Sequence, residues 1–406
     1  MSRVTVSEGL FLLLVFSLPV MQPVYLDYRG YAIPPTDFVF LAAASTAALS
    51  MIRGGVSLRR SPMLWALGLY GAALCASTAA SADRAHSSLK LLGDLYLIGL
   101  AVLTLLHVRS LDGLHRTLIA WLIGAAVTTV AAFAGLLLFG AGVSDPNVNL
   151  FLSIHGSLPD GGYPRVMAWF LNPNAYCAYM VASLAILITS EQVGWVRRGA
   201  LSFEAAMIVA AAFSLSPGLG GLLLVLAFGA WCRWRHSRPG LVRLAIGVSA
   251  AGALLFLAVT TAVPAPDAPL SFSHLRPSSR MLTWIGSLRT FLAHPWLGKG
   301  LGLGVVEIGY TNPSGVYEWL TDAHNTWLSV LAQQGLVGFI AFVSIIAVLF
   351  RGAGLSMTSQ TRVLRSGLTV AFATGFLYQS LSGSFENTRH VWVLIGLLAA
   401  AKDLPE

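Results

Sequence analysis

The chain has 406 residues, of which 56% are hydrophobic and only 10% are charged. A soluble domain of this length has far more charged surface, so the composition excludes a soluble protein and indicates an integral membrane protein. The formal net charge of +8 does not point to a nucleic-acid partner, because the basic residues cluster in short loops between apolar segments.

Apolar segments long enough to cross a bilayer, about 20 residues or about 17 at the short end, recur along the chain. This pattern predicts an all-α polytopic membrane protein with about twelve transmembrane helices. The predicted spans are residues 8–26, 36–52, 62–80, 89–107, 117–140, 168–189, 200–215, 218–232, 244–262, 325–350, 367–383 and 390–402. We therefore expect one integral membrane domain over residues 1–406, without an appended soluble domain.

The distribution of basic residues predicts the orientation, because cytoplasmic loops carry an excess of lysine and arginine. With the N-terminus inside, 16 of the 25 lysines and arginines lie on the cytoplasmic side. We therefore expect both termini in the cytoplasm and two long outer loops, over residues 141–167 and 263–324. Within the second loop, Ser278 to Ala293 predicts a surface helix and Gly298 to Gly304 predicts a flexible turn.

Several arginines lie on the predicted outer face, where the same rule would deplete them. A guanidinium group binds phosphate through paired donors and stays charged at any working pH. For Arg165 and Arg280 we favour an anion-binding role, because each lies within a longer motif. For Arg276 and Arg289 we favour pairing with lipid headgroups or with loop carboxylates.

His324 lies at the mouth of the tenth predicted span, at the end of the second outer loop. Asp322 is well placed to cap that helix or to hold the imidazole. A helix N-terminus disfavours imidazolium, so we expect a neutral ring that can accept a proton from a hydroxyl nucleophile. The alternative is a histidine that only hydrogen-bonds loop backbone, and the position alone would favour that simpler interpretation.

The sequence predicts no metal site and no cofactor, because its outer-face acidic residues are scattered and it has no His-x-x-x-His or Cys-x-x-Cys. Glu204 and Asp94 fall near span ends. A proton-coupled transporter would be expected to carry ionisable groups at mid-depth. This argues against transport, and a lipid or polysaccharide transporter stays the alternative from another class.

Four elements of the chain resemble the O-antigen ligase and O-antigen polymerase superfamily of bacterial envelope glycosyltransferases. They are Pro34-Pro35-Thr36-Asp37-Phe38; Arg165 with Asn172-Pro173-Asn174; Arg280-Met281-Leu282-Thr283-Trp284 with His294-Pro295-Trp296-Leu297-Gly298-Lys299-Gly300; and His324-Asn325 with Gly335 and Gly338. There is one departure. Family members commonly carry Ser-Arg near the turn between the seventh and eighth spans, whereas this turn reads Ser214-Leu215-Ser216-Pro217-Gly218. Another arginine, Arg165 or Arg389, is then expected to substitute.

The resemblance implies a GT-C-like membrane fold and a metal-independent, inverting glycan transfer on the periplasmic face of the bacterial inner membrane. The donor would be a glycan on undecaprenyl pyrophosphate, and the acceptor a hydroxyl of lipid A–core for a ligase. Besides these substrates, the expected partners are membrane lipids. The resemblance assigns catalysis to His324 and Arg280, and assigns substrate binding to Arg165, Asn325, Asp322, Arg389 and Asn174.

Ligase and polymerase share these motifs, and a polymerase would use another lipid-linked repeat as its acceptor. We favour the ligase because the single long outer loop, residues 263–324, carries the arginine and histidine elements. A protein-directed oligosaccharyltransferase of the same superfamily is the third possibility, but such enzymes are usually longer, with an additional C-terminal region.

Overall fold

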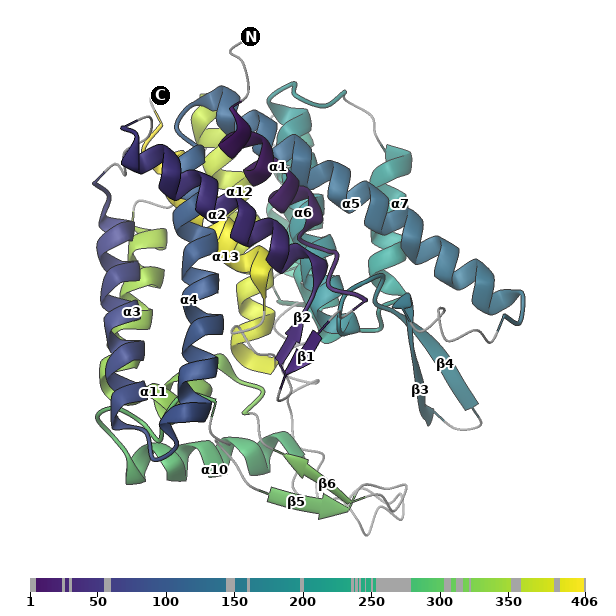
Figure 1. The fold of residues 1–406 in the computed structure, drawn as a ribbon. Helices are drawn as coiled ribbons and strands as arrows, with labels where there is room; N and C mark the ends of the chain where they lie inside the picture. The colour runs from purple at the N-terminus through teal and green to yellow at the C-terminus, as the bar shows by residue number, and fades with distance from the viewer. Residues whose placement is uncertain are drawn as a thin grey trace.

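The structure is a computed structural model in which helices form a bundle and three short β-hairpins lie in its connecting segments (Figure 1). It describes residues 5–23, 26–28, 31–54, 60–143, 150–158, 161–197, 201–234, 237, 240, 242–244, 246–249, 251–252, 279–302, 308–311, 317–320, 323–351, 359–382 and 388–404.

The helices of the bundle follow the predicted order along the chain. They are α1 Val6–Ser17, α2 Pro35–Ile52, α3 Pro62–Ala80, α4 Arg84–His107, α5 Leu111–Gly140, α6 Pro173–Gln192, α7 Leu201–Ala212, α8 Gly220–Trp234, α10 Ser279–Ala293, α11 Thr326–Phe350, α12 Gln360–Ser382 and α13 Arg389–Lys402. A short 3₁₀ turn, Pro217–Leu219, joins α7 to α8. The helix predicted over Ser278 to Ala293 is confirmed as α10, while its place in an outer loop stays a prediction.

Three antiparallel hairpins occur that the all-α prediction did not include. They are β1 Leu26–Tyr28 with β2 Tyr31–Ile33, β3 Leu152–Leu158 with β4 Gly161–Val166, and β5 Ile308–Thr311 with β6 Tyr317–Leu320. Each has only two strands and connects helices, so the helical class of the protein is unchanged.

Every predicted span except 244–262 coincides with a helix, and that span lies mostly outside the described residues. Among the described residues, six helices, α2, α3, α4, α5, α6 and α11, are long and apolar enough to cross a membrane, and α1, α7 and α8 are shorter apolar helices. The structure therefore supports a polytopic membrane protein, while the number twelve stays a prediction. The largest difference is in α1, which ends at Ser17 because Pro19 cannot donate the helical hydrogen bond.

Side-chain caps explain where several helices begin. Ser61, Ser110 and Asn172 precede α3, α5 and α6, and each side chain accepts a hydrogen bond from a backbone N–H of the first turn. Proline at the first or second position of α2, α3 and α6 supplies a backbone angle that suits a helix start.

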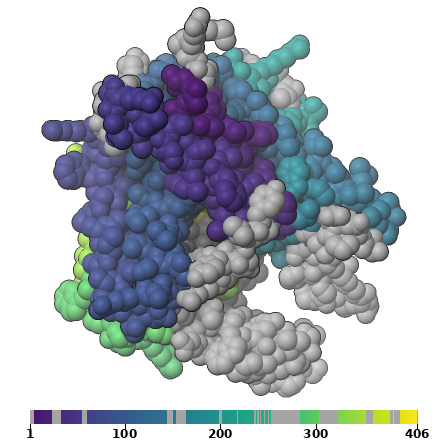
Figure 2. Space-filling model, in the orientation of Figure 1, coloured from purple at the N-terminus to yellow at the C-terminus, as the bar shows by residue number. Residues whose placement is uncertain are grey.

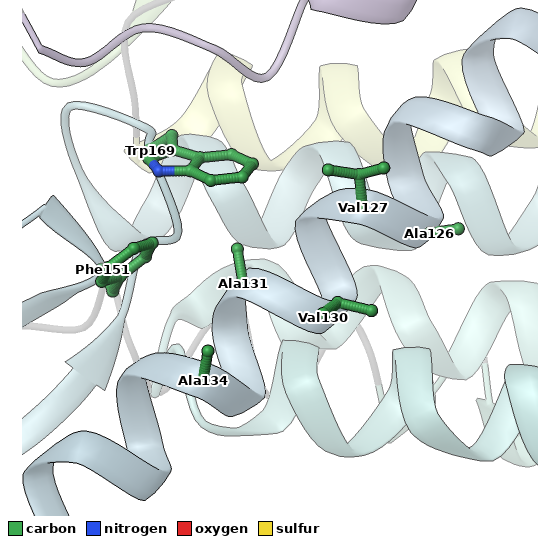
Figure 3. A pocket seen from close by; sticks show the side chains of 7 residues that line it. All are labelled: Ala126, Val127, Val130, Ala131, Ala134, Phe151 and Trp169. Carbon is green, nitrogen blue, oxygen red and sulfur yellow. The ribbon is translucent and has the colours of Figure 1, made fainter.

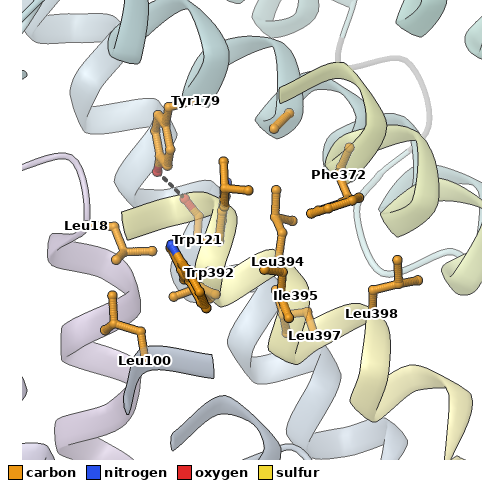
Figure 4. Close-up of a cluster of buried hydrophobic side chains, with 14 of the residues drawn as sticks. Leu18, Leu100, Trp121, Tyr179, Phe372, Trp392, Leu394, Ile395, Leu397 and Leu398 are labelled. Carbon is orange, nitrogen blue, oxygen red and sulfur yellow. Dashed lines mark hydrogen bonds between the residues drawn. The ribbon is translucent and has the colours of Figure 1, made fainter. Parts of the chain in front are cut away.

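The core of the bundle surrounds α13, in which every residue from His390 to Ala401 is buried. A helix that is buried on all sides belongs at the centre of its domain. Trp121 of α5 and Tyr179 of α6 stack beside it with ring centroids 5.3 Å apart, and the Tyr179 hydroxyl donates to the Trp121 carbonyl at 3.3 Å (Figure 4). In contrast, α2 and α4 form much of the face seen in Figure 2, as expected for helices that contact lipid.

Basic residues predicted to be cytoplasmic gather at one end of the bundle. Arg116 lies 2.7 Å from the Glu8 carboxylate, which joins the start of α5 to the start of α1. Arg365 donates to the Ala401 carbonyl at 2.8 Å, and Lys402 donates to carbonyls at the end of α11. The described chain therefore begins and ends at the same end of the bundle (Figure 1), as an even number of spans requires.

At the other end, α11 is interrupted at Gly335, whose φ of 64° and ψ of −164° are not helical. The segment after α10 packs into this break: the Leu336 N–H donates to the Pro295 carbonyl at 2.8 Å, and the Lys299 N–H donates to the Ala332 carbonyl at 2.9 Å. These bonds satisfy backbone groups that the break would otherwise leave unpaired. The described part of the turn that the sequence predicts to be flexible is therefore held against α11.

Replacing Gly335 by alanine should destabilise the protein, because a Cβ atom there would lie 2.4 Å from the Trp296 carbonyl carbon. The backbone conformation alone costs a non-glycine residue about 1–3 kcal/mol. Thermal unfolding in detergent should show a clearly lower midpoint for Gly335→Ala. The matched control is Gly68→Ala in α3, where an added Cβ meets no atom within 4 Å. Equal midpoints for the two variants would contradict the role given to Gly335.

Candidate functional site

The predicted site residues that the structure describes lie in elements at the end of the bundle away from the termini (Figure 1). They are Arg165 on β4, Asn174 in the first turn of α6, Arg280 in the first turn of α10, His324 and Asn325 just before α11, and Arg389 at the start of α13. Asp322 lies outside the described residues.

The guanidinium group of Arg165 is held by three hydrogen bonds. Its Nε donates to the Ser214 carbonyl at 2.9 Å, and its Nη2 donates to Asn174 Oδ1 at 3.1 Å and to the Leu215 carbonyl at 3.4 Å. All three acceptors are neutral oxygens, so these bonds fix the position of the group without balancing its charge. Because they use Nε and Nη2, Nη1 is the nitrogen that they leave to a ligand.

These contacts place Arg165 against the turn that begins at Ser214, where the family arginine is absent from the sequence. The sequence left Arg165 and Arg389 as the candidates to substitute for it. Arg165 contacts the backbone of this turn directly, from a strand more than 40 residues earlier in the chain. The geometry therefore favours Arg165 as the substitute.

Arg389 is placed differently, because its Nη2 lies 3.0 Å from one carboxylate oxygen of Asp37 and 3.1 Å from the other. Its guanidinium carbon also lies 5.4 Å from the centre of the Tyr96 ring. Asp37 therefore balances the charge of Arg389. The Nε and Nη1 atoms of Arg389 have no hydrogen-bond partner among the described residues, so this arginine keeps donors for a ligand.

Arg389 also lies near the segment that follows Arg165. The ring of Phe170 meets that of His390 edge to face, with centroids 6.3 Å apart. This contact joins the segment after Arg165 to the start of α13. Sequence reasoning missed Asp37 as the partner of Arg389, although opposite charges at the starts of two apolar helices were a usable signal.

A second group of site residues lies where α10 meets α11. The Thr283 hydroxyl donates to the Ala323 carbonyl at 3.3 Å, and both residues are buried. Arg280 precedes Thr283 by one helical turn, and His324 follows Ala323 directly. The structure thus brings together the two segments that carry the predicted catalytic residues, which are separated by more than 40 positions in sequence.

His324 is exposed, and its φ of 46° turns the chain sharply before α11. Asn325 is the N-cap of α11, since its side chain accepts a hydrogen bond from the Leu328 N–H at 3.2 Å. The prediction that Asp322 caps this helix is therefore corrected, and α11 begins two residues after His324. The cap fixes the backbone directly beside the histidine.

Unusual backbone conformations mark both groups. Among the described residues, four that are not glycine have a positive φ: Ala168 at 41°, Trp169 at 50°, Leu215 at 49° and His324 at 46°. Such conformations cost about 1–3 kcal/mol each and concentrate at functional sites. The Leu215 carbonyl accepts a hydrogen bond from Arg165. Ala168 and Trp169 follow Arg165 closely in sequence. These strained backbone conformations therefore lie in or near the segments that the motifs predict to form the site.

Two glutamines of α11 were missed by sequence reasoning. Their hydrogen bonds hold the structure around the second group of site residues, where α10 meets α11. Gln333 Oε1 accepts a hydrogen bond from the Gly302 N–H at 2.8 Å, and Gln334 Nε2 donates to the Tyr70 hydroxyl at 3.1 Å. Both side chains are buried next to the break at Gly335. Two consecutive polar residues inside an otherwise apolar span were the signal that could have identified them.

In a comparison with known families, residues 200–343 match the family described as O-antigen ligase. This match confirms the resemblance to the O-antigen ligase and polymerase superfamily, whose members are glycosyltransferase-like enzymes. The matched segment runs from α7 into α11 and contains Arg280 and His324, whereas Arg165 and Asn174 precede it and Arg389 follows it. No curated protein matches the chain.

The cap on α11 gives a direct test of local structure. Replacing Asn325 by alanine should lower the free energy of unfolding by about 1 kcal/mol, because the Leu328 N–H loses its acceptor. Asn325→Ser should keep most of that stability, since serine caps helices about as well as asparagine. Chemical denaturation of the three proteins provides the measurement, and a serine variant as unstable as the alanine variant would contradict the capping role.

Proposed function

We propose that the protein is an O-antigen ligase, which transfers a glycan from undecaprenyl pyrophosphate to a hydroxyl of lipid A–core on the periplasmic face of the bacterial inner membrane. The observation that carries this proposal is the charge of Arg165, which is anchored beside the turn at Ser214 and has no carboxylate partner among the described residues. A diphosphate leaving group gains negative charge as its bond to the sugar breaks, and a fixed cation stabilises that charge.

In the proposed reaction, the acceptor hydroxyl oxygen attacks the anomeric carbon of the donor glycan. The bond between that carbon and the pyrophosphate oxygen breaks, and the lipid pyrophosphate leaves with the electron pair, so the anomeric centre inverts. His324 orients the hydroxyl and takes its proton. Arg280 and Arg165 stabilise the leaving pyrophosphate, and no metal ion is required.

The remaining predicted residues act in different ways under this proposal. Asn174 is a positioning residue, because its amide oxygen accepts a hydrogen bond from Arg165. Asn325 likewise positions the backbone beside His324 through its cap on α11. Arg389 contacts the donor through Nε and Nη1 while Asp37 balances its charge. Asp322, which does not cap α11, keeps its other predicted role of holding the imidazole of His324.

The test of the proposal is transfer by the purified protein, supplied with undecaprenyl-pyrophosphate-linked glycan and either lipid A–core or no second acceptor. We expect glycan on lipid A–core, in equal amounts with and without a chelator. Longer lipid-linked chains formed without lipid A–core would make the protein a polymerase. The absence of product under both conditions would contradict the proposal and favour a transporter.

Site variants in the same assay test the assigned roles. Arg165→Ala and His324→Ala should each reduce the rate roughly a hundredfold or more, the usual effect of losing one electrostatic or proton-transfer group. Arg165→Lys should not restore it, because an ammonium group cannot reproduce the fixed fork of bonds. The control is Arg289→Ala, which removes an exposed arginine of α10 outside the proposed site. Near-normal transfer by Arg165→Ala would show that the diphosphate binds elsewhere.

A further inference from the structure

An apolar groove lies on α5, beside the hairpin that carries Arg165 (Figure 3). Residues between Ala126 and Ala134 form one side, and Phe151 and Trp169 form the other. The volume of the groove is ≈ 440 Å³, within the size range of small-molecule sites. Apart from the indole nitrogen of Trp169, the lining side chains are hydrocarbon, so the groove suits an apolar ligand.

The groove lies at membrane depth, because α5 is long and apolar enough to span a bilayer. Phe151 approaches the helix closely at Gly135, where an added Cβ would lie 2.5 Å from the Phe151 Cβ. Ala131 and Ala134 form the floor of the groove, and their short side chains leave it open. Val130 on its rim is 70% exposed. The groove is therefore open to the lipid phase along one side.

The wall of the groove is held in place by the backbone. Trp169 and the residue before it both have left-handed φ angles, which favour glycine. The Ala168 N–H donates to the Phe151 carbonyl at 3.0 Å, and the Trp169 N–H donates to the Leu150 carbonyl at 3.1 Å. These bonds fix the indole opposite α5, as expected of a wall that must fit a ligand.

The groove lies beside the hairpin that carries Arg165, the anchored cation of the proposed site. In the register of the hairpin, Ser153 is paired with Arg165 and Leu152 with Val166. Phe151 is thus two positions along the strand from the residue opposite Arg165. A ligand with an anionic head and a hydrocarbon chain would therefore contact Arg165 and the groove at the same time.

We propose that this groove binds the polyprenyl chain of the lipid carrier, at the part of the chain next to the pyrophosphate. The inference rests on the proposed function and adds the place where the lipid portion of the donor binds. Bilayer lipid is as apolar as the groove, so hydrophobic burial alone gives little preference. Preference for this chain comes from packing between Phe151, Trp169 and the alanine floor.

The test compares two donors in the transfer assay: the undecaprenyl donor and one whose pyrophosphate carries a methyl group in place of the chain. Ala134→Phe, which fills the groove, should raise KM for the undecaprenyl donor roughly five- to thirtyfold, the factor that about ten lost van der Waals contacts represent. The kcat for this donor and the KM for the methyl donor should not change. The control is Ala48→Phe, which adds the same bulk at an exposed position of α2.

A similar KM change for both donors, or none for either, would overturn the groove assignment while the ligase activity stood. Should Ala134→Phe fail to fold, Val130→Trp on the exposed rim serves as the second variant. A photoreactive polyprenyl pyrophosphate gives a readout that does not depend on transfer, so it separates failure of the groove from failure of the proposed function. It should label the peptides containing Phe151 and Trp169, and undecaprenyl pyrophosphate should compete. Equal labelling by a photoreactive phospholipid would show that the groove holds bulk lipid only.

Discussion

The charge of Arg165, fixed by neutral oxygens at the end of the bundle away from the termini, is the constraint on which the proposed site depends. Its bonds tie β4 to α6 through Asn174 and to the turn before α8 through Ser214. Two other partly buried arginines are balanced by carboxylates, Arg389 by Asp37 and Arg116 by Glu8. Because guanidinium stays charged, the bonds to Arg165 hold a positive charge ready for an anion.

The second part of the site depends on a break in a helix rather than on a charge. Gly335 interrupts α11, and the segment after α10 fills the gap with backbone hydrogen bonds. This docking, together with the bond from Thr283 to Ala323, holds α10 across the start of α11. The glycines allow the segment after α10 to approach α11 closely, and this approach positions the backbone at Arg280 and His324. This explains why glycines and candidate catalytic residues occur in the same motifs.

Apolar length predicted nearly every helix of the fold, since the thickness of the bilayer limits each span. The described residues of the motifs lie in elements at the end of the bundle away from the termini, while their roles stay predictions. The pairing of Asp37 with Arg389, 352 positions away, was missed, because the opposite charges at the starts of two apolar helices do not by themselves show which distant helices meet. The sequence also pointed to Asp322 as a cap of α11, whereas the cap is Asn325, because asparagine caps helices as well as aspartate and lies directly before the first helical residue.

The most direct measurement is a cryo-EM structure of the protein in lipid nanodiscs with undecaprenyl pyrophosphate bound. The account predicts a phosphate oxygen within about 2.7–3.2 Å of Arg165 Nη1, with the bonds to Ser214 and Asn174 retained. A pyrophosphate bound away from Arg165, for example at Arg389 after release of Asp37, would contradict it.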